Sequence, residues 1–284
     1  MMKRVATALF ALMASQTLLA QNFDDVQIKS EKINDSVYML TGMGGNIGVS
    51  AGDDGILIID DQFAPLAEKI SSSLEGIAGK KLRYVINTHY HGDHTGGNAK
   101  IKHMHDATVF AHDNVRVRLE NDPKKEAADL PVVTYAKGVK FHFNGETIHV
   151  RHLPHAHTDG DSYVYFEKAN VIHTGDVMFN KMFPYIDLNG GGSVAGYIRA
   201  IEIILADVND DTKVMPGHGV VATKQDVENF LNMLKETRRI VLDKKAVGDS
   251  VESIIKQGLG EEWQSWAWQF ISEEKWIRTL YDGR

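Results

Sequence analysis

The 284-residue chain contains no cysteine, which excludes a disulfide framework, a thiolate ligand for a metal ion and a lipid-anchor cysteine. Any metal site must therefore use His, Asp or Glu side chains. The chain also has no block or stripe of lysine and arginine, and its formal net charge is −7. An acidic protein of this kind repels a phosphate backbone, so we expect a small-molecule substrate and no nucleic-acid partner.

Linkers and repeats are absent as well. We find no segment rich in Pro, Gly or Ser, no low-complexity tract and no detectable repeat. The hydrophobic content of 43% is ample for a sizeable core. These features favour one domain over residues 21–284, with a helical C-terminal segment from about 224 to 284.

The N-terminus is typical of a targeting segment. Lys3 and Arg4 supply positive charge, residues 5–19 are mostly apolar, and Ala20 and Gln21 form a plausible cleavage junction. The apolar run is too short to span a bilayer comfortably. We therefore expect residues 1–20 to be a cleaved signal peptide, which leaves no stable membrane anchor and places the protein in the periplasm or outside the cell.

Hydrophobic periodicity predicts alternating strands and helices. Strands are expected at residues 26–33, 37–41, 47–51, 55–60, 82–86, 108–111, 140–143, 147–152, 162–166, 171–174 and 213–215. Helices are expected at residues 65–77, 114–120, 194–205 and 224–245, and a helical pattern covers 251–281. Two mixed β/α halves in one layered α/β domain is the simplest architecture for this order.

A cluster of potential metal ligands follows the apolar strand predicted at 82–86. It places His89, His91, Asp93 and His94 within six residues. Imidazole and carboxylate groups suit zinc and similar divalent ions. Three histidines and an acid at this spacing are rarely gathered by chance, so the cluster predicts a metal site in the loop after this strand.

Three further residues could bind a metal ion, and each lies on a Gly-containing turn beside a predicted strand. They are His157, Asp176 and His218. Together with the cluster they could hold two ions. Two divalent ions roughly 3.5 to 4 Å apart can share a water molecule and lower its pKa, giving a hydroxide that attacks a carbonyl or phosphorus. Asp93 could accept or orient the proton of that nucleophile, so hydrolysis is the expected reaction.

In this order, the motif His89-x-His91-x-Asp93-His94 and the three later ligands resemble the metallo-β-lactamase fold superfamily. The β/α layout extends the resemblance from about Val26 to the C-terminus. The resemblance implies an α/β fold, a four-layer αββα sandwich of two mixed β-sheets flanked by helices. It also implies an active site in the loops along one edge of the paired sheets.

The resemblance further implies which residue binds which ion. One ion would be bound by His89, His91 and His157, the other by Asp93, His94 and His218, with Asp176 bridging them. The ions would be two zinc ions per chain, and iron or manganese is also possible.

The substrate is less well indicated than the site. In exported β-lactamases with a thiolate ligand, Cys stands where this chain has Asp176, and a carboxylate-binding Lys stands where it has Phe179. Asp176 matches the broader hydrolases of the superfamily, including lactonases, thioesterases of the glyoxalase II type and phosphodiesterases. Residues 86–97 nevertheless resemble the class B β-lactamase motif closely.

Export disfavours glutathione thioesters and tRNA precursors, which are cytosolic. We therefore expect an exported zinc-dependent hydrolase that opens a small cyclic amide or ester, a β-lactam or lactone-like ring. A β-lactam substrate would make it an antibiotic-resistance enzyme. The alternatives are a thioester or phosphodiester hydrolase of the same fold and an iron-dependent oxidoreductase similar to persulfide dioxygenases.

Three residues near the ligands are candidates for substrate contact, namely Tyr90, Phe179 and Lys181. The Gly-containing segment 43–46 resembles the mobile flap that many superfamily members lay over the substrate. The four tryptophans of the last segment are expected to dock the tail onto the body of the protein.

Overall fold

The computed structural model describes residues 22–283, so the predicted signal peptide lies outside the described residues. The strands in this range form a 7-stranded sheet and a 5-stranded sheet. The first contains β1 (Lys29–Lys32), β2 (Val37–Thr41), β3 (Ile47–Gly52), β4 (Gly55–Ile59), β5 (Leu82–Ile86), β6 (Thr108–His112) and β7 (Val133–Tyr135). The second contains β8 (Gly138–Phe143), β9 (Glu146–His152), β10 (Ser162–Phe166), β11 (Val171–His173) and β12 (Lys213–Met215).

Both sheets are mixed, as expected. In the first, β1 to β4 are antiparallel neighbours in sequence order, whereas β4 to β7 pair in parallel. In the second, β8 to β11 are antiparallel and β12 is parallel to β11. Central β4 is buried on both faces, which explains its uninterrupted apolar sequence.

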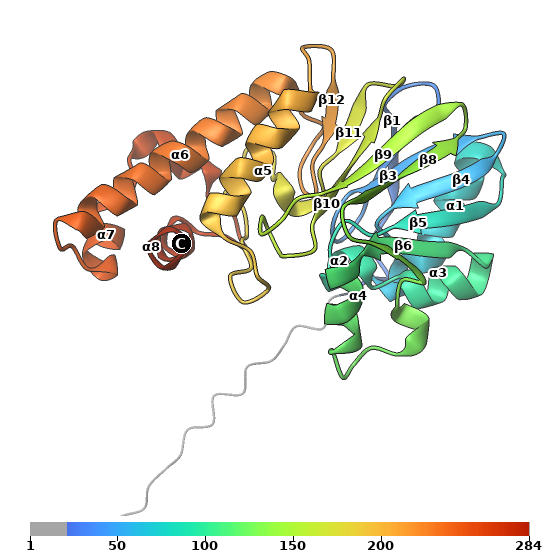
Figure 1. Cartoon of the computed structure of the whole chain (residues 1–284), viewed down its shortest axis with the longest axis horizontal. Helices are drawn as coiled ribbons and strands as arrows, with labels where there is room; N and C mark the ends of the chain where they lie inside the picture. Colours follow the sequence, from blue (N-terminus) through green and yellow to red (C-terminus); the bar gives the residue numbers. More distant parts are fainter. Residues whose placement is uncertain (1–21, 284) are drawn as a thin grey trace, which may run out of the picture.

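Helices cover the outer face of each sheet (Figure 1). The helices are α1 (Ala67–Ala78), α2 (Gly92–Thr95), α3 (Asn98–His105), α4 (Asp113–Glu120), α5 (Val194–Asp207), α6 (Lys224–Ala246), α7 (Val251–Gln257) and α8 (Glu273–Asp282). Apolar residues of α1 and α3 pack on the first sheet, and those of α5 and α6 pack on the second. A third apolar core lies between the two sheets. The predicted four-layer αββα sandwich is therefore confirmed.

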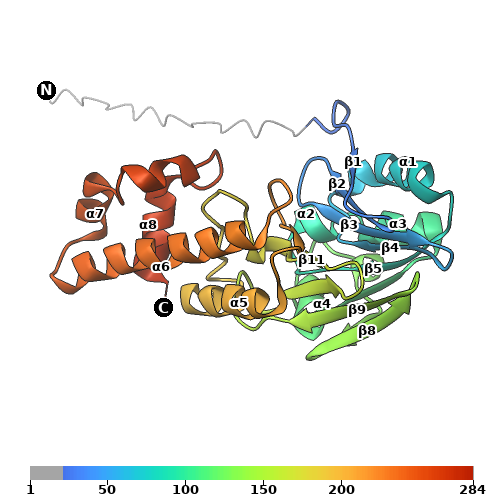
Figure 2. The ribbon, with the colours of Figure 1, turned by 90° about the horizontal axis from the view of Figure 1, so that it is seen from above.

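Within the C-terminal segment, α6 lies beside α5, and α7 and α8 pack against α6 and against each other, farther from the sheets (Figure 2). The predicted helical stretch 251–281 is divided into α7, a 3-10 helix (Glu261–Trp266) and α8. Gly258 and Gly260, with φ of 73° and 123°, turn the chain after α7. Trp276 docks this segment as expected, because it is fully buried and its indole N–H donates to Thr237 Oγ1.

Two strands differ from the sequence prediction. β1 begins at Lys29 rather than at Val26, and all four of its residues are exposed at the edge of the sheet. β7 was not predicted, since it has only three residues, two of which are exposed. Among residues 22–283, no helix combines the length and the apolar character needed to cross a bilayer.

Candidate metal centre

The seven predicted ligands converge in the loops along one edge of the sheets. His89 and His91 follow β5, and Asp93 and His94 lie in the short helix α2, which begins directly after His91. Potential ligand atoms form two groups in which all atoms lie within 4.8 Å of one another. The first group is His89, His91, His157 and Asp176, and the second is Asp93, His94 and His218.

Asp176 lies between the two groups and presents one carboxylate oxygen to each. Its Oδ2 atom is 3.9 Å from His89 Nε2 and 3.6 Å from His157 Nε2. Its Oδ1 atom is 3.0 Å from His94 Nε2 and 3.4 Å from His218 Nε2. A carboxylate in this position can contact two cations at once, which is the role that the resemblance implies for Asp176.

Four of the histidine rings are held by a hydrogen bond at one ring nitrogen, the one that points away from the other ligand atoms. The bonds are His89 Nδ1 to Thr88 Oγ1 (3.0 Å), His94 Nδ1 to Asp60 Oδ2 (2.7 Å), His91 Nε2 to Asp187 Oδ2 (3.0 Å) and His157 Nδ1 to the Tyr185 carbonyl (2.7 Å). Metal-ligating histidines commonly have such a partner, which sets the tautomer and the ring orientation. The inner nitrogen of each ring is thereby left free to bind a cation.

Several atoms inside the centre lack the partner that a cation would provide. His91 Nδ1 and His157 Nε2 are 2.9 Å apart, although each ring already donates its other N–H to a carboxylate or carbonyl oxygen. In the neutral rings, two lone pairs therefore face each other. The buried atom His89 Nε2 has no hydrogen-bond partner, and His94 Nε2 and Asp176 Oδ1 lie 3.0 Å apart without the geometry of a hydrogen bond. Because buried polar atoms are normally paired, this donor set fits divalent cations.

The protonation states differ between the two ligand groups. Burial lowers the pKa of His157 to about 4 and holds the pKa of His89 well below its ordinary value, so both rings are neutral at pH 7. Burial opposes ionisation of Asp176, but His94 and His218 outweigh it and hold the pKa of this carboxyl well below its usual range. The first ligand group therefore offers the neutral rings of His89 and His157 beside an ionised carboxylate. In the second group, burial opposes protonation, but Asp176 and the other nearby carboxylates outweigh it, raising the pKa of His218 to about 9 and that of His94 well above its ordinary value, so a cation bound there displaces protons.

Asp60 was not predicted from the sequence, and its carboxylate holds the ligand loop in place through hydrogen bonds to Thr88 and His94. This fully buried carboxylate follows β4 and accepts hydrogen bonds from Thr88 N (2.7 Å) and Thr88 Oγ1 (2.8 Å) in addition to its bond with His94. It thus fixes both the start of the ligand loop and one ligand ring. Its position directly after a buried strand was the available signal, the same signal that identified Asp176.

Asp187 is a second missed residue, and it explains where Tyr90 lies. Its carboxylate accepts hydrogen bonds from the Tyr90 hydroxyl and from Gly190 N and contacts His91 Nε2. Tyr90 was predicted to contact substrate, but its hydroxyl is directed to Asp187 and its ring lies beside Arg118. The structure therefore places Tyr90 behind His91, outside the lining of the cavity described next.

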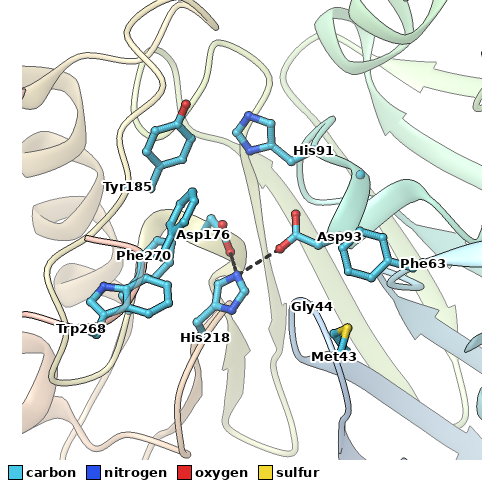
Figure 3. Close-up of a pocket in the computed structure, with 12 residues that line it drawn as sticks. Met43, Gly44, Phe63, His91, Asp93, Asp176, Tyr185, His218, Trp268 and Phe270 are labelled. Carbon is cyan, nitrogen blue, oxygen red and sulfur yellow. Dashed lines mark ion pairs between the residues drawn. The ribbon is translucent and has the colours of Figure 1, made fainter. Parts of the chain in front are cut away.

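The ligand groups open into a cavity of about 480 Å³ (Figure 3). His91, Asp93, Asp176 and His218 form its floor. One side is lined by Phe179, Tyr185, Trp268 and Phe270, and the facing side by Met43, Gly44 and Phe63. The segment 43–46, which resembles a flap, thus contributes Met43 and Gly44 to the side of the cavity that faces the aromatic rings. The predicted role of Phe179 fits this position, since its ring stacks on His218 with centroids 5.0 Å apart.

Lys181 does not reach the cavity, contrary to the expectation that it contacts substrate. Its side chain is 72% exposed, and its ammonium lies 3.8 Å from Asp226 of α6. The residue has a left-handed backbone conformation with φ of 61°, in the turn that follows Phe179. This turn leaves the Phe179 ring in the cavity and the Lys181 side chain on the outer surface.

A sequence model of the metallo-beta-lactamase superfamily matches residues 40–218, a range that contains all seven ligands. The chain belongs to this superfamily. Two similar curated relatives are hydroxyacylglutathione hydrolases. The one from Rhizobium meliloti (strain 1021) is 29% identical over 161 residues, which is 55% of this chain and 55% of the relative. The one from Pelagibacter ubique (strain HTCC1062) is 29% identical over 194 residues, or 63% and 71% of the two chains.

Two solved structures share the fold of this chain. A metallo-beta-lactamase from Pontibacter korlensis superposes with a TM-score of 0.65 at 17% identity, covering 74% of this chain and 99% of that one. The sec-alkylsulfatase Pisa1 from Pseudomonas sp. superposes with a TM-score of 0.71 at 16% identity, covering 90% of this chain and 50% of that one. The chain spans about half the length of the Rhizobium hydrolase and of the alkylsulfatase.

Part of the cavity lining comes from residues that lie C-terminal to the range matched by the superfamily model. The superfamily match ends at residue 218, whereas Trp268 and Phe270 come from the C-terminal segment. All four tryptophans were expected to dock the C-terminal segment onto the body of the protein. Trp276 does so, but Trp268 lines the cavity, and the pattern of its segment carried no signal that distinguishes the two roles.

Proposed function

We propose that the protein is an exported, zinc-dependent hydrolase that opens small cyclic esters or amides. The observation that carries the proposal is the position of the two ligand groups, joined by Asp176, at the floor of one cavity of about 480 Å³. Cavities of roughly 300 to 1,000 Å³ lined by apolar side chains and a few polar groups are typical of small-molecule sites. Membership of a metallo-hydrolase superfamily supports hydrolysis as the reaction class.

The chain's own residues suggest how the reaction is organised. Two bound divalent ions would supply Lewis-acid polarisation of the scissile carbonyl and a water of lowered pKa. Asp93 lines the cavity and has 27% of its side chain exposed, with Oδ2 at 3.3 Å from His218 Nε2. It is the carboxylate best placed to accept the proton of an attacking water. The apolar side walls would hold the substrate over this floor and exclude bulk water.

Hydrolysis of thioesters is the second candidate, because two similar relatives are named hydroxyacylglutathione hydrolases. The glutathione part of such a substrate carries two carboxylates. The described residues that line the cavity include neither lysine nor arginine, so those carboxylates would lack a cationic partner there. This observation favours a cyclic ester or amide over a glutathione thioester.

A substrate panel with metal analysis tests the reaction. The zinc-loaded protein should hydrolyse an acyl-homoserine lactone faster than a chromogenic cephalosporin, which carries a carboxylate, and a chelator should abolish turnover until zinc is restored. A thioester substrate completes the panel. Fully occupied metal sites without chelator-sensitive hydrolysis of any of the three would contradict the proposal. Iron in the isolated protein, together with oxygen consumption on a persulfide, would support an oxidoreductase instead.

Asp93→Asn provides the matched variant for this test. The amide is close in size to the carboxylate but cannot accept a proton at neutral pH, so we expect turnover to fall by roughly 10²- to 10⁴-fold. The circular-dichroism spectrum and the thermal midpoint should stay close to those of the parent protein, because Asp93 is partly exposed. Unchanged turnover in the zinc-loaded variant would remove Asp93 from the catalytic role.

Export is tested separately from catalysis. N-terminal sequencing of the protein from a periplasmic fraction should begin near Gln21. A cytosolic protein that retains Lys3 and Arg4 would contradict export without bearing on the hydrolytic reaction.

A further inference from the structure

Four rings form a continuous aromatic wall on one side of the cavity, in the order Phe179, Trp268, Phe270 and Tyr185. Trp268, Phe270 and Tyr185 are labelled in Figure 3, and the Phe179 ring lies next to that of Trp268. The ring centroids of neighbours in this series are 6.1, 5.6 and 5.6 Å apart. Two of the rings come from the loop after β11, and two come from the segment between the 3-10 helix and α8. The wall is thus assembled from segments that are far apart in the sequence.

Hydrogen bonds fix these two segments to each other. Phe183 N donates to the Trp266 carbonyl (2.8 Å), and the Trp268 indole N–H donates to the Phe183 carbonyl (2.9 Å). Trp268 N in turn donates to the Ile271 carbonyl (3.0 Å). Because the polar edge of the Trp268 indole is already bonded, the ring offers the cavity an apolar surface. The wall is therefore a preformed feature of the fold.

Core packing alone does not explain these rings. Phe270 is 53% exposed and Trp268 is partly exposed, whereas Trp276 of the same segment is fully buried. An aromatic side chain gains most from burial, so a rigid ring left open at a cavity mouth is typical of a binding surface. Met43 and Phe63 present apolar surface from the opposite side. An apolar group that enters the cavity would be covered on both sides.

The charges around the wall favour a neutral ligand. Two lysines lie near it, but neither lines the cavity. Lys275 lies 3.9 Å from the ring centroid of Phe270 and donates to the Phe270 carbonyl, and Lys181 faces Asp226. An anionic substituent directed away from the metal floor would meet aromatic faces, which carry partial negative charge. It would find no cationic partner among the residues that line the cavity, because the Lys275 ammonium lies against the Phe270 and Tyr185 rings outside that lining.

We propose that Trp268 and Phe270 determine substrate specificity by binding a neutral aromatic substituent next to the scissile bond. The substrate class would then be aryl-substituted lactones or lactams without a free carboxylate. As a statement about hydrolysis this proposal rests on the proposed function, but binding of the aromatic group does not. The specificity element lies beyond the range matched by the superfamily, so it is a property of this chain's C-terminal segment.

Three lactones that differ in one substituent test the kinetic part on the zinc-loaded protein: γ-butyrolactone, its γ-phenyl derivative and its γ-carboxy derivative. We expect kcat/KM for the phenyl lactone to exceed that for the other two by roughly 10- to 100-fold. Trp268→Ala and Phe270→Ala should each remove roughly tenfold of this preference, mainly by raising KM, because the lost contact is made equally in the ground and transition states. Turnover of γ-butyrolactone should fall by a smaller factor than turnover of the phenyl lactone.

Three further variants serve as controls. Trp263→Ala removes a tryptophan of the same segment that does not line the cavity, and it should retain the preference. Trp268→Phe keeps an aromatic ring without the indole hydrogen bond, so it should retain most of the preference even where Trp268→Ala perturbs the fold. A preference for the carboxy lactone that disappears in Lys275→Met would overturn the assignment of a neutral substituent.

Binding of benzyl alcohol, a neutral aromatic probe without a hydrolysable bond, separates this proposal from the proposed function. Saturation-transfer NMR should show contact with its ring protons in the zinc-loaded parent and in Trp263→Ala, and loss of contact in the Trp268→Ala/Phe270→Ala double variant. Such binding without hydrolysis of any lactone would support the aromatic site and contradict the reaction. Equal signals in the parent and the double variant, with no preference among the lactones, would overturn the site.

Discussion

The floor and the aromatic wall of the cavity are built in different ways. The floor belongs to the two ligand groups, which consist of ionisable side chains on loops beside strands, and four of the five histidine rings in these groups are held by hydrogen bonds to their other nitrogen. The wall consists of rings that offer surface area, two of which come from the C-terminal segment. The buried polar network is therefore the part of the site suited to the chemistry, and we propose that the apolar wall selects the substrate.

This difference between floor and wall predicts which substitutions have large effects on stability or activity and which have small ones. A change in the floor or its supports leaves buried polar atoms without partners, which is costly. A change in the wall removes contact area while the floor remains intact. The largest effects should therefore come from residues that support the floor, and the smallest from side chains outside the cavity.

Asp60→Ala should have the largest effect on stability. The substitution leaves Thr88 N, Thr88 Oγ1 and His94 Nδ1 without their partner in a fully buried region. We expect the free energy of unfolding to fall by about 3 to 5 kcal/mol, as when one partner of a buried ionic pair is removed. Urea unfolding in the presence of chelator measures this loss for the protein without metal.

Asp60→Asn is the matched control for that experiment, because its amide oxygen can still accept from Thr88 N. It should lose less stability than Asp60→Ala. If both variants unfold at the same urea concentration as the parent protein, Asp60 does not support the floor, and the comparison with the wall loses its basis.

Asp187→Ala should act on metal binding rather than on overall stability. Its carboxylate contacts His91 Nε2 at 3.0 Å, and without it the imidazole can rotate or change tautomer. We expect metal affinity to fall by roughly 10- to 100-fold, the range typical of such outer partners. Competition with a chromogenic zinc chelator gives the affinity without recourse to enzyme activity.

Tyr90→Phe is the control for Asp187→Ala. It removes only the hydroxyl that donates to Asp187 and leaves the contact between Asp187 and His91 in place. Its affinity for zinc should therefore lie between those of the parent and of Asp187→Ala. An affinity in Asp187→Ala equal to that of the parent would show that His91 is positioned without this carboxylate.

Lys181→Met should have the smallest effect. The lysine is exposed and its contact with Asp226 is a surface ion pair, so its contribution to stability is at most about 1 kcal/mol. We expect no measurable change in KM for any of the three lactones. A higher KM confined to the carboxy lactone would bring Lys181 back into the substrate site and would weaken the distinction between the wall and the outer surface.

Much of the floor was predictable because its residues obey local rules. His157, Asp176 and His218 each stand on a turn beside an apolar strand, and the rigid sheets bring such turns to one edge. Asp60 obeys the same rule but stands alone, without a neighbouring ligand motif to single it out. Asp187 lies in a loop distant from any strand end, so nothing local indicated that it contacts His91.

The sequence by itself indicated a layered α/β domain and the metal-ligand set, since hydrophobic periodicity and ligand spacing are properties of short segments. The four-layer arrangement was implied by the resemblance to the superfamily. Only the tertiary structure decided which side chains enter the cavity. Tyr90 turned to Asp187, Lys181 turned to the outer surface, and Trp268 reached Phe183 across 85 positions of sequence. Such contacts depend on how separate segments pack, and no pattern within one segment records them.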